Sequence, residues 1–317
     1  MDKTRFSRVF FRGCLSVLLL VAALLAPRSS SGEDATAWPE TMYGVHVGTG
    51  IDKKNETGLA WGLETNGHAG LIERVDQQIE QAGRAPDFLL LHFPGAFIEW
   101  RIEMIGLHVL REGGYGLSPH PVAVETLPLW NDFLLRHKIP GVLYLGSLFQ
   151  PATEALWKED QTNCELVIGE TLQLAKASGF RWVACDEIVR QDRPLHDPIR
   201  KYFLNAARSR GIGIVVEAWP HKSQESLFGS SPAWMTHSAF LTQHPAVSPH
   251  RWGQANHESR RGLVVYDAWA SRKEPFSPEL ANRIVEAHCW PAIDFDQWGE
   301  IAGSFPEKKS PIELTIE

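Results

Sequence analysis

Acidic residues stand at the ends of four short apolar runs, and they are the first candidates for chemistry. They are Asp186 and Glu187 after residues 181–185, Glu217 after 212–216, Asp267 after 262–266 and Asp294 after 290–293. Two carboxyl groups held close together can cleave a glycosidic bond. One donates a proton to the leaving oxygen, and the other attacks the anomeric carbon or activates water. A partly dry cleft moves their pKa values apart, so both roles are available at one pH. The alternative, that these acids are helix caps or ion-pair partners, stays open.

Side-chain alternation predicts which acids face one another. Successive residues of a strand point to opposite sides. In the run 212–216 the bulkier residues occupy one side of the strand, and Glu217 continues the other side. We expect the bulkier side to pack against covering helices, which predicts that Glu217 points inward. In 181–185 we expect Trp182 to pack against helices, which turns Glu187 inward beside Glu217. Glu187 is then the expected general acid/base and Glu217 the nucleophile or water-activating base. Asp267 competes with Glu217 for its role, and Asp186 would tune or orient the pair.

Histidines and tryptophans near the same run ends predict a sugar-binding surface. His46, His92 and His237 lie in the runs 43–47, 88–93 and 233–238, and Trp219 and Trp269 follow Glu217 and Asp267 by two residues. Flat indole rings stack on the apolar faces of pyranose rings, although tryptophan also packs in cores. We expect these five residues to line the substrate subsites.

A metal-dependent hydrolase is the competing interpretation of the same histidines. His46, His92, His237, Asp186 and Asp267 are residue types that bind transition metals. The sequence has no H-x-H in 43–47 and no H-E-x-x-H. Our leading hypothesis therefore includes no metal and no cofactor.

The apolar runs alternate with amphipathic stretches, and this pattern predicts a parallel sheet with crossover helices. The expected strands are 43–47, 88–93, 141–145, 181–185, 212–216, 233–238, 262–266 and 290–293. The expected helices are 68–81, 125–137, 164–177, 198–210, 278–288 and 296–302. This count predicts an α/β fold with a single (β/α)8 (TIM) barrel, whose site lies at the carboxyl ends of the strands. An open doubly wound sheet is the alternative, but no G-x-G-x-x-G follows the first run. Residues 95–124 are expected to form a long loop.

The N-terminus has the layout of a secretory signal. Basic residues precede an apolar run over 15–26, and small residues follow it. We expect a signal peptide over 1–32, with cleavage alternatively after residue 37, a barrel over 38–305 and a C-terminal tail over 306–317. An uncleaved anchor is the alternative, but the run is short for spanning a bilayer. The mature protein is therefore expected to be secreted or periplasmic, without stable membrane insertion.

Composition limits the classes of partner. The chain has 317 residues, 44 % of them hydrophobic, with a formal net charge of −7 and a pI near 6.0. This balance is typical of a globular protein and lacks the basic surface that duplex nucleic acid requires. Removal of residues 1–32 leaves three cysteines, too few for a disulfide framework. We expect a carbohydrate partner and no nucleic acid, and the oligomeric state stays open.

Two segments resemble a known group of enzymes. The segments YGVHVGTG (43–50) and VDQQIEQAGRAPDFLLLHF (75–93) are similar to the first βαβ unit of secreted glycoside hydrolases of the trans-glycosidase barrel superfamily, which includes endo-mannanases. The resemblance implies a (β/α)8 barrel and an acid/base glutamate after the fourth strand, where Glu187 stands. The largest clan of that superfamily has Asn-Glu at that place and a nucleophile Glu after the seventh strand. This chain has Asp186-Glu187 and Asp267 instead. A family that uses the fourth and fifth strands and a non-catalytic carbohydrate-binding barrel both remain open.

Overall fold

The computed structural model describes residues 42–48, 63–93, 104–110, 117–119, 121–145, 151–185, 196–217, 233–237, 262–266, 277–286 and 289–306. By internal contacts the chain divides into Met1–Ala37 and Trp38–Glu317, and all described residues belong to the second unit. The expected signal segment therefore lies outside the described residues. Among the helices that are described, none combines the length and apolarity needed to cross a membrane.

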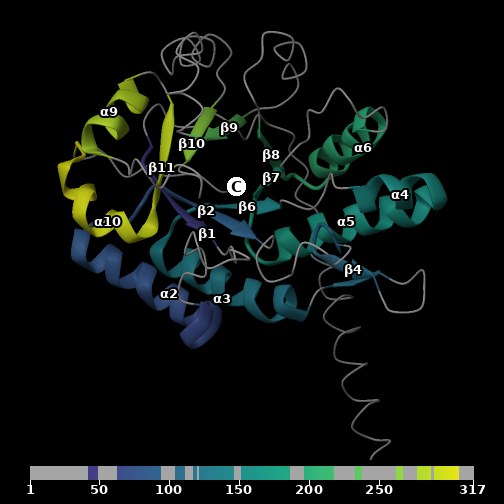
Figure 1. The fold of residues 1–317 in the computed structure, drawn as a ribbon, viewed down its shortest axis with the longest axis horizontal. Helices are drawn as coiled ribbons and strands as arrows, with labels where there is room; N and C mark the ends of the chain where they lie inside the picture. Colours follow the sequence, from purple (N-terminus) through teal and green to yellow (C-terminus); the bar gives the residue numbers. More distant parts are fainter. Residues whose placement is uncertain are drawn as a thin grey trace, which may run out of the picture. The chain divides into compact units, whose positions relative to one another are not determined.

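Eight parallel strands of the described residues close into a barrel (Figure 1). In chain order they are β1 (Gly44–Gly48), β2 (Phe88–Phe93), β6 (Gly141–Leu145), β7 (Trp182–Cys185), β8 (Gly213–Glu217), β9 (Ala233–His237), β10 (Gly262–Tyr266) and β11 (Trp290–Asp294). The spatial order follows the sequence, and β11 pairs with β1 to complete the ring. Each expected strand is present, with bounds that differ from the prediction by at most one residue.

Helices follow most of these strands in the described part of the chain (Figure 1). They are α2 (Leu63–Ala82), α3 (Pro121–His137), α4 (Pro151–Glu159), α5 (Gln161–Ala177), α6 (His196–Ser209), α9 (Pro278–Glu286) and α10 (Phe295–Ile301), which continues into the 3-10 turn Ala302–Ser304. Side-chain caps explain where α5 and α9 start. The Asp160 carboxylate accepts the backbone N–H of Asn163 at 3.0 Å, and the Ser277 hydroxyl accepts that of Leu280 at 3.1 Å. Helix α4 was not expected from the sequence.

The segment expected to be an irregular loop, 95–124, contains ordered structure. A three-stranded antiparallel sheet forms from β3 (Met104–Ile105), β4 (His108–Leu110) and β5 (Leu117–Pro119), and α3 already begins at Pro121. The prediction of a loop was wrong because these strands have two or three residues each, too few to show periodicity.

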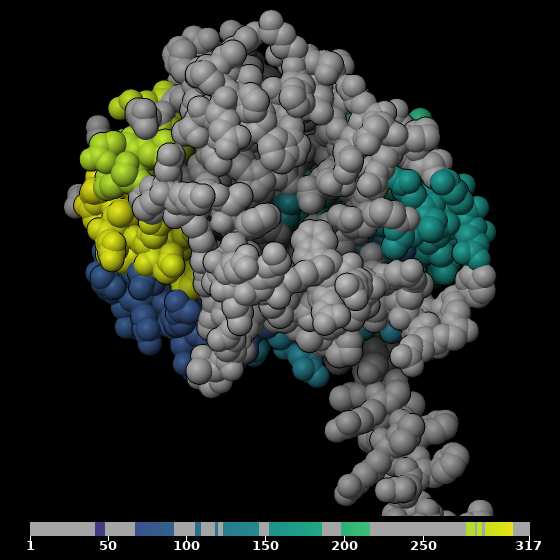
Figure 2. Space-filling model, in the orientation of Figure 1, coloured from purple at the N-terminus to yellow at the C-terminus, as the bar shows by residue number. Residues whose placement is uncertain are grey.

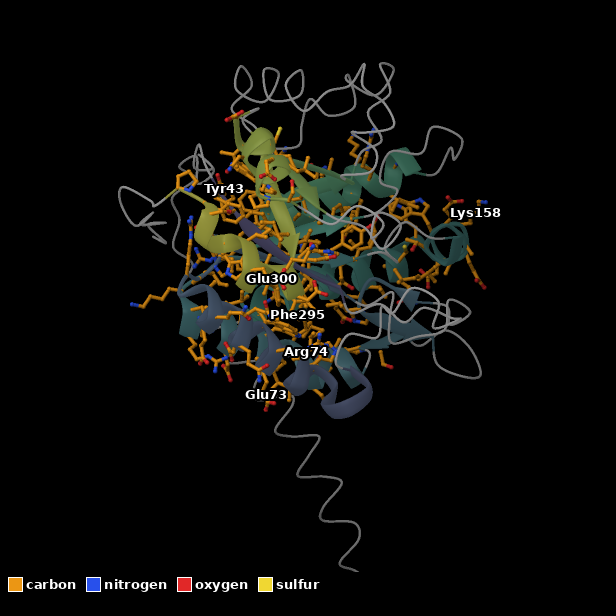
Figure 3. All side chains as sticks on the ribbon, turned by 60° about the vertical axis from the view of Figure 1, so that its left-hand side comes forward. Tyr43, Glu73, Arg74, Lys158, Phe295 and Glu300 are labelled. Carbon is orange, nitrogen blue, oxygen red and sulfur yellow. The ribbon has the colours of Figure 1, made fainter. Side chains whose placement is uncertain are left out.

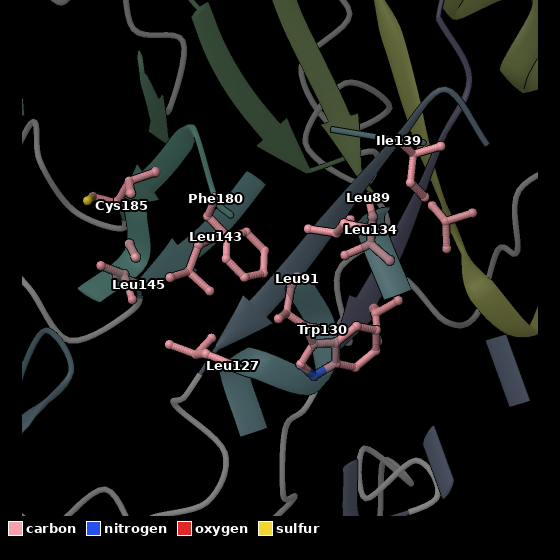
Figure 4. Packing of buried hydrophobic residues seen from close by; sticks show 14 of the residues in the cluster. Leu89, Leu91, Leu127, Trp130, Leu134, Ile139, Leu143, Leu145, Phe180 and Cys185 are labelled. Atoms are coloured by element: carbon pink, nitrogen blue, oxygen red, sulfur yellow. The ribbon is translucent and has the colours of Figure 1, made fainter. Parts of the chain in front are cut away.

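Two apolar clusters hold the barrel together. The larger one lies between strands and helices. Figure 4 shows part of it, where alternate residues of β2 and β6 pack against α3. The smaller one fills the barrel interior and contains Phe88, Leu90, Tyr144, Val215 and Trp290 among others. Odd and even positions of a strand therefore belong to different cores, as expected for a barrel whose inside is packed.

One orientation differs from the prediction. Trp182 packs against the inner cluster, whereas Val183 and Cys185 belong to the outer one. The expectation that Trp182 contacts helices was therefore wrong. The reason lies on the neighbouring strand, where Gly213 pairs with Trp182. A Cβ on Gly213 would lie 2.0 Å from Cε3 of Trp182, so the missing side chain makes room for the indole inside the barrel.

Helix α10, near the end of the described residues, packs along α2, the first of the described helices. The guanidinium of Arg74 lies 5.1 Å from the ring centre of Phe295, and the amide of Gln78 accepts the backbone N–H of Gly299 at 2.9 Å. Figure 3 shows Arg74 beside Phe295, and in Figure 2 the yellow surface of α10 adjoins the blue surface of α2. This contact covers β1 and β11, where the barrel closes.

Candidate functional site

A buried pair of polar side chains connects the first and last barrel strands. Nδ1 of His46 on β1 lies 3.1 Å from Oδ1 of Asp294 on β11, and the two residues are in register. Their side chains are 3 % and 9 % exposed. An ionised carboxylate only accepts hydrogen bonds, so we assign the hydrogen to Nδ1 of His46. Of the predicted substrate-binding residues, His46 is the one whose side chain the structure describes.

Apolar residues fill the barrel on the amino-terminal side of this pair. A Cβ on Gly44 would lie 2.2 Å from Cζ of Phe88, which shows that the phenyl ring covers β1 just before His46. Ala292, two residues before Asp294, belongs to the same inner cluster. The pair therefore stands on the carboxyl-terminal side of the packing that Phe88 and Ala292 form against β1 and on β11.

Strand register places Glu217 at an interior position of the backbone. Glu217 is the last residue of β8, and its partner on β9 is Met235. The same row continues through Val264 of β10 to Trp290 of β11, which belongs to the inner cluster. Paired positions of parallel strands lie on the same side of a sheet, and Glu217 also follows the interior residue Val215 by two positions. The side chain of Glu217 lies outside the described residues, but the backbone agrees with the predicted inward position.

Two histidine positions follow the same rule. His92 of β2 pairs with Tyr144 of the inner cluster, and His237, the last residue of β9, pairs with Tyr266. Tyr266 in turn pairs with the interior residue Ala292. The side chains of His92 and His237 lie outside the described residues, so their predicted sugar contacts stay predictions.

The remaining predicted site residues are Asp186, Glu187, Asp267, Trp219 and Trp269, and all five lie outside the described residues. Asp186 and Glu187 follow directly after the last residue of β7, and Asp267 follows directly after the last residue of β10. The strand ends that carry them are therefore where the sequence placed them, at the carboxyl rim of the barrel.

The sequence prediction counted Asp294 among the strand-end acids but gave it no role in the site. Its position after an apolar run gave the same signal as the other acids. The missing information was the closure of the ring, because only the β1–β11 pairing brings Asp294 to His46. Among the described side chains no group of three or more His, Cys, Asp or Glu is arranged to hold a metal ion.

Three further buried titratable residues, His68, Cys164 and Cys289, lie between strands and helices rather than inside the barrel. Burial lowers the pKa of His68 to about 4 and raises the pKa of the Cys164 and Cys289 thiols to about 12. No disulfide joins these two cysteines and Cys185. Thiols with such pKa values carry almost no thiolate at neutral pH, which makes them poor nucleophiles.

Comparison with known proteins gives no family assignment. No protein-family profile matches the chain, and no curated protein matches it.

Solved structures with a similar trace belong to several kinds of protein. A GH113 β-mannanase from Alicyclobacillus acidocaldarius gives a TM-score of 0.49 at 8 % identity, covering 82 % of this chain and 90 % of that one. Aspergillus fumigatus Ega3 in complex with galactosamine gives 0.38 at 10 % identity, covering 53 % and 80 %. A D-allulose 3-epimerase from Methylomonas gives 0.46 at 13 % identity, covering 84 % and 96 %. At these scores the likenesses assign neither an activity nor a site, so the proposals below depend on this chain's own residues.

Proposed function

We propose that the chain is an exported hydrolase that cleaves a glycosidic bond of an oligosaccharide or polysaccharide with carboxyl groups at the carboxyl rim of its barrel. The observation that carries this proposal is the position of Glu217, which ends β8 and stands on the interior alternation beside Val215. An acid at this rim reaches the mouth of the barrel, where enzymes of this architecture bind substrates. We assign Glu217 the role of nucleophile or water-activating base.

The second carboxyl group comes from the neighbouring strand in this proposal. Cys185, the last residue of β7, pairs with Val216 of β8, so the acids that follow Cys185 start one strand away from Glu217. The interior position of Trp182 favours Asp186 over Glu187 when the alternation of β7 is continued. Asp186 and Glu187 are both tested below, together with Asp267.

The proposed sugar subsites combine His46, His92 and His237 with the two tryptophans, Trp219 and Trp269. The support for this part is the interior register of the three histidine positions. Secretion or periplasmic location, directed by residues 1–32, completes the proposal.

Single amide substitutions test the assignment of the acids. The full chain and the variants Glu217→Gln, Asp186→Asn, Glu187→Gln and Asp267→Asn are assayed on a panel of polysaccharides and aryl glycosides. We expect Glu217→Gln and one further variant to lower kcat by about 10²-fold or more, because an amide neither ionises nor transfers a proton. Glu300→Gln is the matched control, because Glu300 is an exposed acid of α10 (Figure 3) and its loss leaves kcat unchanged.

Three results would decide against this function. Full turnover by Glu217→Gln removes the assigned carboxylate. Sugar binding without any product on the whole panel points to a carbohydrate-binding barrel. Activity that disappears with a chelator and returns with a transition metal points to the metal-dependent hydrolase.

A further inference from the structure

Exposed basic residues gather at the amino-terminal ends of three adjacent barrel strands. These are the ends where α3 leads into β6, α5 into β7 and α6 into β8. The residues are Lys138, Lys176, Arg181 and Arg208, and we call them the basic patch. No acidic residue occurs within 138–142, 176–183 or 208–213. The barrel therefore has a positive surface at these three strand starts, although the chain as a whole has a formal net charge of −7.

The three strand starts lie side by side. A Cβ on Gly141 of β6 would lie 2.5 Å from Cδ1 of Leu134 in α3 and 2.8 Å from Cδ1 of Phe180, the residue before Arg181. The carbonyl of Arg181 accepts the backbone N–H of Gly213 at the start of β8 at 2.9 Å. The basic patch is therefore one surface at the amino-terminal end of the barrel, opposite the rim where Glu217 ends β8.

The charges of the basic patch are not neutralised by acids of the described part of the chain. Among the described side chains, none forms an ion pair with these four residues. Asp76 of α2, the acid that contacts this end of α3, is already bound by Arg136 and His137. A cation in the last turn of a helix stabilises the helix dipole, which accounts for Lys176 and Arg208. It does not account for Arg181, which follows α5 and stands directly before β7.

Lys138 occupies a backbone position where glycine is the usual residue. Its φ is 56°, in the left-handed region. The corresponding turns after α2, α5 and α6 have Gly83, Gly179 and Gly211, with φ of 63°, 81° and 65°. A residue with a Cβ is strained in this region, and glycine is not. The turn after α3 therefore has a cation at the position where the other three turns avoid strain, which is consistent with a role for the lysine side chain.

An exposed leucine adjoins the basic patch. Leu135, in the last turn of α3, is 67 % exposed, the highest value among the large hydrophobic residues that are described. Its carbonyl accepts the backbone N–H of Lys138 at 3.3 Å, so the two residues belong to the same turn. An apolar side chain among cations is favoured at the surface of a bilayer, where it enters the boundary between headgroups and acyl chains. A soluble polyanion offers no such environment to Leu135.

The extent of the basic patch suits a surface rather than a small ion. Neighbouring strands lie about 4.8 Å apart, and the helices that cover them lie about 8–10 Å apart. Cations spread over three strand starts do not converge on one phosphate or carboxylate. They match a plane that presents many anionic groups.

We propose that the basic patch and Leu135 bind the surface of a bilayer with anionic headgroups. The four cations pair with lipid phosphates, and Leu135 enters the headgroup boundary. A chain of net charge −7 is repelled by such a surface as a whole, so its attachment needs a local positive face of this kind. Attachment through the amino-terminal end leaves the opposite rim of the barrel, with Glu217, directed away from the lipid. This inference does not depend on the glycosidase function.

Sedimentation with lipid vesicles tests the proposal. The exported chain is mixed with vesicles of phosphatidylcholine alone and of phosphatidylcholine with an equal amount of phosphatidylglycerol. Each variant is compared with the wild type in the same processed form, so residues 1–32, where retained, contribute equally. We expect binding to the mixed vesicles that weakens as salt is added, and no binding to phosphatidylcholine. No difference between the two kinds of vesicle overturns the proposal.

Lys138→Gly separates the charge from the fold. Glycine suits the left-handed φ, so we expect an unchanged or higher urea midpoint together with an affinity for the mixed vesicles that is lower by about 5-fold, the factor for one basic side chain near such a surface. Arg181→Gln is expected to lower the affinity by a similar factor. Lys158→Gln, which removes an exposed cation of α4 outside the patch (Figure 3), is the matched control and leaves binding unchanged. Equal binding by Lys138→Gly, Lys158→Gln and the wild type overturns the proposal.

Leu135→Ser distinguishes a bilayer from a soluble polyanion. We expect this variant to bind the mixed vesicles more weakly than Leu166→Ser, which replaces an exposed leucine of α5. Dextran sulfate is the second probe. If the chain binds dextran sulfate through Lys138 and Arg181, and Leu135→Ser binds vesicles as well as Leu166→Ser does, the partner is an anionic polymer and the bilayer proposal is overturned.

Discussion

At the scale of single residues, two buried histidines differ in the partner that their Nδ1 atoms meet. His46 faces a carboxylate inside the barrel, whereas His68 faces an indole donor between α2 and α3. Nε1–H of Trp130 donates to Nδ1 of His68 at 2.8 Å, which requires that nitrogen to be unprotonated. His68 is therefore held in its neutral form.

The neutral form of His68 makes stability depend on pH. Burial lowers its pKa from 6.5 to about 4, so below pH 6.5 the unfolded chain binds a proton that the folded chain does not. The stability contribution is complete above pH 6.5 and is lost as pH falls toward 4. We expect the wild type to lose up to about 3 kcal/mol more than His68→Gln over this range, because glutamine keeps an acceptor but does not titrate. Urea unfolding at a series of pH values measures the difference, and parallel curves would contradict it.

From the sequence, the direction of a side chain is predictable where its own strand determines it, and it is not predictable where a neighbouring strand does. The interior backbone position of Glu217 follows from alternation within its own strand. The interior position of Trp182 depends on Gly213 of the next strand, and the pairing of His46 with Asp294 depends on residues 248 positions apart. The size of a side chain does not predict which face of the sheet it occupies when a glycine on the neighbouring strand leaves room for it.

At the scale of elements, the barrel strands were predictable because they are continuous apolar runs between turn residues. The sheet β3–β5 was not, since its contacts are made with a distant helix. The hydroxyl of Thr171 on α5 accepts the backbone N–H of Leu107 at 3.2 Å and lies 3.0 Å from Nδ1 of His108. Nε2 of His108 lies 3.1 Å from Glu170, so this imidazole links the sheet to α5 at both nitrogens.

Replacement of Thr171 tests whether these bonds hold the small sheet on α5. Thr171→Val keeps the shape but leaves the N–H of Leu107 and a buried nitrogen of His108 without their partner, which costs about 1–3 kcal/mol. We expect faster proteolytic cleavage within residues 104–119, measured by mass spectrometry of the first fragments. Thr162→Val, an exposed position on the same helix, is the matched control. Equal cleavage rates in the two variants would show that other contacts hold the sheet.

At the scale of the whole barrel, aromatic packing ties the end of the described chain to the first strand. The rings of Tyr43 and Phe305 stack with their centres 4.1 Å apart, and Trp298 lies 5.9 Å from Phe305. Arg84 donates from Nη1 to the carbonyls of Phe305 and Pro306 at 3.3 and 3.0 Å. Because β1 and β11 close the ring beside these residues, the packing supports the closure that also brings His46 to Asp294.

Phe305→Ala tests whether this closure is part of one cooperative unit. The substitution removes a buried ring from the Tyr43 and Trp298 surfaces, and we expect a loss of about 3 kcal/mol in the free energy of unfolding. If the barrel unfolds as one unit, the urea midpoint falls while the slope of the transition is unchanged. Leu166→Ala, a large-to-small change at an exposed position of α5, is expected to have little effect. A second transition in Phe305→Ala, seen by tryptophan fluorescence but not by circular dichroism, would mean that the closing segment unfolds separately. The His46–Asp294 pair would then be lost before the rest of the barrel, and activity would fall with the first transition.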